Sequence, residues 1–98
     1  MAIDYNKLAY HCVEDEINNG VNNVYINKGN LSVIRTLLIT NFSSTADITF
    51  KLNLITNASR TVEAGKTFRI SDEGLIEFVY LSNASGSAVR FSVFMIGA

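Results

Sequence analysis

Seven short apolar runs, separated by turn-forming residues, occupy the chain from Val21 onward. Apolar and polar residues alternate within most runs, as in a strand with one face on the core and one in solvent. Gly, Asn and Asp gather between the runs, where turns require them, and the chain contains no proline. The runs are Val21–Asn27, Leu31–Thr40, Asp47–Ile55, Arg60–Glu63, Lys66–Ser71, Leu75–Ser82 and Ala88–Ile96. The pattern predicts an all-β fold, an antiparallel β-sandwich of about seven strands that is Ig-like or jelly-roll-like.

Two stretches share one layout, Leu37–Ile55 and Phe78–Ile96. Each contains a strand that ends in Thr-Asn or Ser-Asn, a polar turn, and a strand whose apolar residues alternate with polar ones. We expect both stretches to form β-hairpins, the second of which closes the sandwich.

The alternation assigns a core-facing side to several strands. The residues expected in the core are Ile48, Phe50, Leu52, Leu54, Phe68, Ile70, Val89, Phe91, Val93 and Met95. The last two predicted strands differ, because apolar residues occur on both of their faces. A strand that is apolar on both faces is normally covered on both, so we expect an N-terminal helix or another subunit to cover the second face.

The N-terminal segment, residues 1–20, is predicted to be a helix or an extended arm preceding a sandwich domain at 21–98. Apolar residues recur at helical spacing over Asp4–Ile17, and Asn18-Asn19-Gly20 provides a stop signal. Four acidic residues and one lysine give this segment a net charge of −3, which leaves +2 for the remainder. The asymmetry would suit a head-to-tail contact between copies, and a solvated charged face is the alternative.

Composition narrows the classes of function. The chain has 98 residues, enough for one domain, with 48% hydrophobic and only 17% charged residues, and a partner subunit is the simplest cover for the apolar excess. A net charge of −1 provides no field for phosphates, so we expect no nucleic-acid partner. We also expect no membrane partner and no cleaved signal, because no run is long enough to span a bilayer and the N-terminus lacks a basic and apolar leader.

The sequence contains fragments of several motifs, but each fragment lacks an essential part. Gly65-Lys66-Thr67 lacks the upstream glycine of a phosphate-binding loop, and Asp15–Ile26 has Ile26 where a calcium loop requires glutamate. His11 and Cys12 are the only histidine and the only cysteine, and as chain neighbours they project in different directions. We therefore expect no enzyme activity and no catalytic, cofactor or metal site, and a single cysteine allows no intramolecular disulfide.

Three features occur together: the repeated layout with its Ser/Gly-rich turns, the segment Val62-Glu63-Ala64-Gly65-Lys66-Thr67-Phe68, and the ending Val93-Phe94-Met95-Ile96-Gly97-Ala98. Over Val21 to Ala98, this combination of features resembles the small β-sandwich virion proteins of tailed bacteriophages. These include head-decoration proteins and small collar or tail components. The resemblance implies a structural protein present in many copies, located in the virion after assembly in the host cytoplasm.

The resemblance also implies partners. We expect a homo-oligomer, with a trimer favoured, that binds other virion proteins such as the major capsid protein and stabilises the assembled shell by mass action. The segment Met1–Gly20 is expected to dock on a neighbouring copy. The residues expected at the subunit interface are Phe94, Ile96, Val79, Leu81, Tyr5 and Leu8.

An alternative function is a receptor- or glycan-binding module of a phage fibre or a cell surface. Sugar rings stack on exposed aromatic side chains, and Phe42, in the turn Asn41–Ala46, is the candidate for this role.

Overall fold

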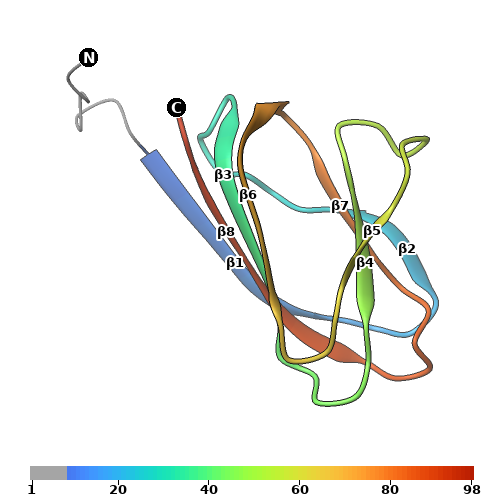
Figure 1. The fold of residues 1–98 in the computed structure, drawn as a ribbon. Coiled ribbons are helices and arrows are strands. Elements are labelled where there is room, and N and C mark those ends of the chain that lie inside the picture. Colours follow the sequence, from blue (N-terminus) through green and yellow to red (C-terminus); the bar gives the residue numbers. More distant parts are fainter. Residues whose placement is uncertain (1–8) are drawn as a thin grey trace.

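The computed structural model describes residues 9–98, apart from the side chains of residues 72 and 73. This part of the chain contains eight strands and no helix (Figure 1). The strands are β1 (Ala9–Ile17), β2 (Val21–Tyr25), β3 (Ile34–Asn41), β4 (Ile48–Leu52), β5 (Arg60–Val62), β6 (Thr67–Ile76), β7 (Val79–Asn83) and β8 (Val89–Gly97). The prediction of an all-β sandwich is confirmed.

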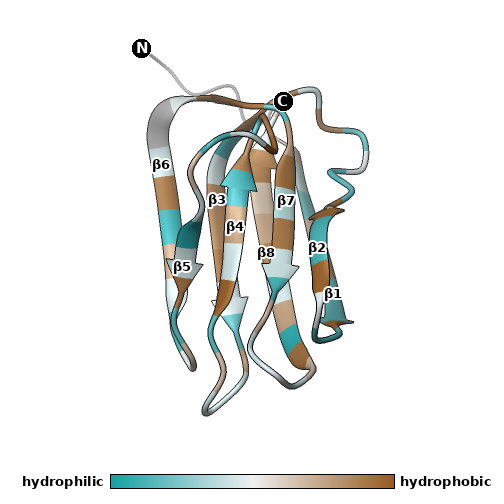
Figure 2. Cartoon of the chain, turned by 90° about the vertical axis from the view of Figure 1, so that its right-hand side faces the viewer, coloured by the Kyte–Doolittle hydropathy of each residue, from teal (hydrophilic) through white to brown (hydrophobic). Residues whose placement is uncertain are grey.

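The strands form two four-stranded antiparallel sheets. Sheet A has the order β1-β8-β3-β6 and sheet B the order β2-β7-β4-β5. Figure 2 shows sheet B toward the viewer, with sheet A behind it. The chain changes sheet at every connection except the one between β4 and β5, which pair with each other. Eight strands wound between two sheets in this way form a jelly roll.

The core lies between the sheets and is built by alternating residues, as the sequence pattern requires. On β8, Val89, Phe91, Val93 and Met95 are buried, whereas the residues between them are exposed or half-buried. The ring of Phe50 meets that of Phe68 edge-on, with 5.1 Å between the centroids. Leu54, also expected in the core, is 60% exposed because β4 ends at Leu52.

The prediction of two hairpins is wrong. β3 belongs to sheet A and β4 to sheet B, and likewise β7 belongs to sheet B and β8 to sheet A. Each turn therefore crosses between the sheets as an arch instead of joining two paired strands. Alternation along a strand specifies the side that faces the core, but an arch and a hairpin leave the same alternation, so the pattern could not separate them.

The helix predicted over Asp4–Ile17 is also wrong where the structure describes it, because residues 9–17 form β1. All nine residues of β1 pair with β8. Val13 and Ile17 point inward, and a spacing of four residues returns to the same side of a strand as well as of a helix. Residues 4–8 of the predicted helix lie outside the described residues.

The boundary between β6 and β7 also differs from the prediction. Residues 71–74 were expected to form a turn and instead lie within β6, where the pairing with β3 shifts register between Ile34 and Thr36. The next turn is held by Asn53, at φ +67°, whose Oδ1 accepts hydrogen bonds from the backbone N–H groups of Glu77 (2.8 Å) and Phe78 (3.3 Å). The predicted run Leu75–Ser82 is thus divided between two strands in different sheets.

Candidate functional site

The outer face of sheet A is the candidate site, and we call it the A face. It consists of the outward side chains of four strands in register: Tyr10, Cys12, Glu14 and Glu16 on β1; Arg90, Ser92, Phe94 and Ile96 on β8; Thr36, Leu38 and Thr40 on β3; and Thr67, Arg69 and Ser71 on β6. The register aligns Cys12, Phe94, Leu38 and Arg69 in one row across all four strands. Phe94 and Ile96 of β8 and Leu38 of β3 therefore form an apolar strip on the two middle strands of the face.

The apolar strip is partly open to solvent. Phe94, Ile96 and Leu38 are each half-buried, although no other layer of the described chain packs on them. Tyr10 stacks on Phe94, with 5.8 Å between ring centroids and 22° between ring planes, and is itself 75% exposed. Stacked rings give the strip a flat surface of the kind that favours association.

Charge on the A face is distributed unevenly. Glu14 and Glu16 lie on the β1 side, with Glu16 directly opposite Arg90 of β8. Arg69 lies on β6, at the other edge, where its Nε donates a 3.2 Å hydrogen bond to Ser71 Oγ. The β1 edge of the face thus carries two carboxylates, one of them opposite Arg90, and the β6 edge carries Arg69.

The structure separates the residues predicted to form a subunit interface. Phe94 and Ile96 lie on the A face, but Val79 and Leu81 are in the core, only 1% and 0% exposed. These two side chains are not available to a partner, because they point from β7 into the core between the sheets. β7 lies in sheet B and β8 in sheet A, so the outward apolar side chains of β8 are not continuous with them. Tyr5 and Leu8 lie outside the described residues.

A second group of aromatic residues, partly exposed, could not be predicted from the sequence. Tyr25 of β2 and Tyr80 of β7 have ring centroids 6.2 Å apart, and Phe78 lies 6.1 Å from Tyr25 and 6.4 Å from Tyr80. Lys28 Nζ sits 4.8 Å from the centre of the Phe78 ring and donates a hydrogen bond to the carbonyl of Glu77. Only the pairing of β2 with β7 brings the two tyrosines together, and no pattern in the sequence specifies the register of these strands.

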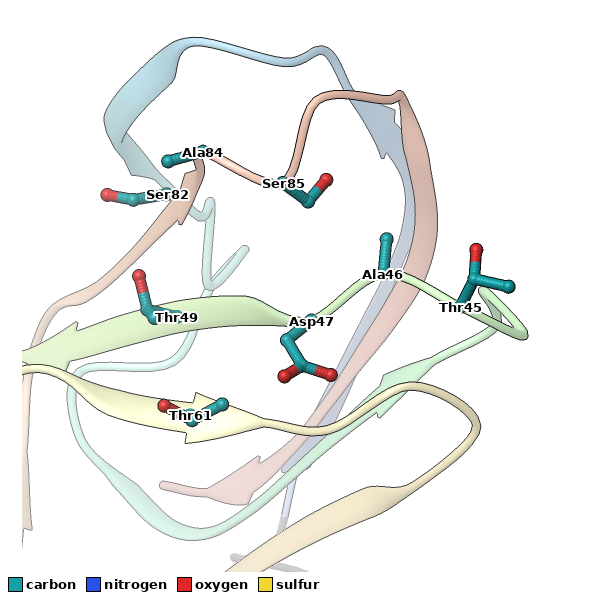
Figure 3. A pocket seen from close by; sticks show the side chains of 8 residues that line it. All are labelled: Thr45, Ala46, Asp47, Thr49, Thr61, Ser82, Ala84 and Ser85. Atoms are coloured by element: carbon teal, nitrogen blue, oxygen red, sulfur yellow. The ribbon is translucent and has the colours of Figure 1, made fainter.

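A hollow of about 430 Å³ opens on the outer side of sheet B. Figure 3 shows the hydroxyl groups that line it, among them Thr49 of β4, Thr61 of β5 and Ser82 of β7. Asp47 also lines the hollow, and its Oδ1 accepts a 2.9 Å hydrogen bond from the backbone N–H of Ala64. The carboxylate therefore has a structural task in holding the turn after β5.

His11 and Cys12 point to opposite sides of β1. His11 faces inward, against Gly29, where an added Cβ would lie 2.6 Å from His11 Nδ1. Cys12 is exposed on the A face. The geometry does not form a thiolate–imidazole pair, and among the side chains that the structure describes no three His, Cys, Asp or Glu gather as metal ligands would.

The remaining predicted binding residue, Phe42, is 58% exposed in the arch between β3 and β4. It is accessible to a ligand but is not among the residues lining the hydroxyl-rich hollow. Over the described range, no helix is long and apolar enough to cross a membrane.

Comparisons with known proteins bear on the fold. No family model matches the sequence, and no curated protein matches it either. Among solved structures, a de novo designed double-stranded β-helix matches with 12% identity and a TM-score of 0.55, over 87% of this chain and 97% of the design. A chain of Bacillus endospore appendages, described as disulfide-linked pili, matches with 13% identity and a TM-score of 0.56, over 100% of this chain and 96% of its own. At these identities the likenesses concern the fold alone, and they agree with the two-sheet arrangement described above.

Proposed function

We propose that the chain is a structural subunit that associates with copies of itself in a virion, as a capsid decoration protein of a tailed phage. The observation that carries self-association is the half-exposed strip of Phe94, Ile96 and Leu38 on the A face. The virion setting rests on the resemblance in the sequence. The chain would bind an assembled shell and stabilise it over its dissociated parts by mass action.

The energetics of the strip support association. Complete burial of a large apolar side chain contributes roughly 1.5–3 kcal/mol, and the half-exposed members retain a share of this for a partner. A few such residues at the centre of an interface provide most of its binding energy. The A face is also made of strands, so its shape is fixed before association and little order has to be gained.

The test is the solution mass of the purified 10.8 kDa chain by light scattering over a concentration series. We expect a defined multiple of 10.8 kDa that dissociates to the monomer in Phe94→Asp. The matched control is Tyr25→Asp, which adds the same charge at an exposed aromatic residue of sheet B and should leave the mass unchanged. A wild-type chain that remains monomeric at every concentration would refute self-association.

A second candidate is a subunit of a surface fibre. The observation in its favour is that this chain matches the pilus chain over 100% of its own length and 96% of the other. Open fibres require a heterologous contact that repeats without closing. Electron microscopy of the concentrated protein separates the candidates, since filaments with a regular repeat favour the fibre and discrete particles favour the decoration protein.

A further inference from the structure

The A face carries opposite charges at its two edges and apolar side chains between them. Glu14 projects from β1, and Arg69 projects from β6 at the far edge. Three strand spacings of about 4.8 Å separate them, roughly 14 Å, so they cannot pair within one chain. A guanidinium has five N–H donors, so the bond to Ser71 leaves Arg69 able to bind a carboxylate as well.

We propose that the A face binds the A face of a second copy through a two-fold axis that runs parallel to the strands, between β8 and β3. This deepens the self-association proposed above and rests on it. The rotation places β1 of each copy over β6 of the other, so Glu14 lies over Thr67 of the second copy, twice over, and Arg69 is two residues, about 7 Å, further along that strand. The same rotation places Phe94 over Leu38 of the second copy, because these residues share a row.

The charges select this axis over the other face-to-face arrangement. A two-fold axis perpendicular to the strands would place β1 over β1 and β6 over β6, so an axis along the row of Phe94 would bring the Arg69 side chains of two copies together. Like charges brought together at an interface are strongly unfavourable. Face-packed sheets cross at about 30°, which displaces the edges by only a few ångströms, within the reach of an arginine side chain.

The area of the A face is adequate for such a contact. Four strands at about 4.8 Å spacing, the longest of nine or ten residues, form a flat face of about 19 by 30 Å. The flat area is therefore about 570 Å². The relief of the side chains increases the area that a partner can bury, toward the roughly 800 Å² per partner of a standard specific interface. Isologous two-fold contacts are also the commonest way in which identical chains associate.

Charge reversal tests the axis. In Glu14→Arg the new arginine faces Arg69 of the second copy, and in Arg69→Glu the new glutamate faces Glu14, so each variant alone should bind itself at least a hundredfold more weakly than wild type. Mixed in equal amounts, the two variants should form a 21.6 kDa heterodimer, twice 10.8 kDa, because each edge then meets its opposite charge. The double variant Glu14→Arg/Arg69→Glu should recover the wild-type mass.

The matched controls are Glu63→Arg and Lys66→Glu, which reverse exposed charges in the turn between β5 and β6 without touching the A face. Both should leave the dissociation constant unchanged. Circular dichroism on every variant verifies that the sheets are intact.

The outcomes separate this inference from the proposed function. An oligomer that dissociates in Phe94→Asp but is indifferent to both charge reversals would keep self-association and overturn the two-fold arrangement. A trimer, the state favoured by the sequence resemblance, would overturn it as well. A monomeric wild type would refute both proposals, whereas recovery in the mixture and in the double variant supports both.

Discussion

Two of the arches between the sheets, from β3 to β4 and from β7 to β8, are held by the same arrangement of a buried asparagine although their sequences differ. Asn41 begins the arch from β3 to β4, and Asn83 begins the arch from β7 to β8. Both side chains are 0% exposed, and they are the only buried polar side chains among the described residues. The repeated layout in the sequence therefore reflects a shared structural role, although that role is not a hairpin turn.

Each asparagine makes the same set of hydrogen bonds. Asn41 Nδ2 donates to the carbonyls of Ala46 (2.7 Å) and Val62 (3.1 Å), and Asn41 Oδ1 accepts from the N–H of Ser43 (2.8 Å). One bond closes the arch, one ties it to a neighbouring strand, and one begins the turn. An amide side chain provides both donors and an acceptor in one plane.

Asn83 repeats this set. Its Nδ2 donates to the carbonyls of Ser87 (2.8 Å) and Ile17 (2.9 Å), and its Oδ1 accepts from the N–H of Ser85 (3.0 Å). The difference lies in the surroundings. The Asn83 arch also contacts the turn between β1 and β2, where the N–H of Gly20 donates to the carbonyl of Asn83 (2.7 Å) and the N–H of Gly86 donates to Asn19 Oδ1 (2.8 Å).

The largest effect is expected from removing either amide. Asn41→Ala and Asn83→Ala should each lower the free energy of unfolding by about 3–5 kcal/mol, because buried backbone groups lose their partners at about 1–3 kcal/mol each. Urea denaturation monitored by circular dichroism measures both. A loss below about 1 kcal/mol in one variant would break the equivalence of the two arches.

The isosteric change to aspartate tests the donated hydrogen bonds of the same two residues. A carboxylate has the shape of the amide but no donor, so Asn41→Asp and Asn83→Asp should be at least as destabilising as alanine at neutral pH. Burial against two carbonyls should raise the pKa of the new carboxyl in the folded state. The deficit relative to wild type should therefore shrink as the pH falls, because the protonated acid can donate one hydrogen bond.

A smaller effect is expected at the serines of the two arches. Ser43 Oγ accepts from the N–H of Ala46 (2.9 Å) and of Thr45 (3.2 Å), whereas Ser85 Oγ contacts Asn83 Oδ1 (2.6 Å) and the carbonyl of Ser87 (3.0 Å). Ser43→Ala and Ser85→Ala should each cost about 0.5–1.5 kcal/mol in the same urea assay. If a serine change lowered the free energy of unfolding more than the asparagine changes do, the hydroxyl groups and not the amides would be the main stabilising groups of the arches.

The smallest effect on stability is expected at Phe42, which follows Asn41 and is exposed, whereas the equivalent residue in the other arch is Ala84. Phe42→Ala should leave the midpoint of urea unfolding unchanged. It also tests the glycan-binding alternative, since glycan-array binding by wild type that is lost in this variant would favour a receptor module over a decoration protein.

Much of the sandwich could be predicted from local pattern. Each of the seven predicted runs overlaps a strand, and the inward residues of β8 follow directly from alternation. For β1 a helix or an extended arm was predicted, because Val13 and Ile17 fit the helical period as well as that of a strand. The pairing of the strands could not be predicted, because strands that are distant in the sequence become neighbours only in the folded sheet. Val79 and Leu81 were therefore assigned to the wrong face.

The candidate site shows the same limit. Phe94 and Ile96 could be named from the sequence because their strand is apolar on both faces. Leu38 and Arg69 could not be linked to them, since the row Cys12, Phe94, Leu38 and Arg69 depends on three strand pairings. The cluster of Tyr25, Phe78 and Tyr80 was missed for the same reason.

The position of β8 between β1 and β3 has a consequence for biosynthesis. While the ribosome is still making residues 89–97, both β1 and β3 lack their shared neighbour, so sheet A cannot close during the earlier part of translation. Contacts between distant segments also slow folding, and unpaired strands are prone to aggregation in the interval. We therefore expect nascent chains arrested before residue 89 to be sensitive to proteases and to be bound by chaperones, and protection to arise abruptly once β8 has left the exit tunnel.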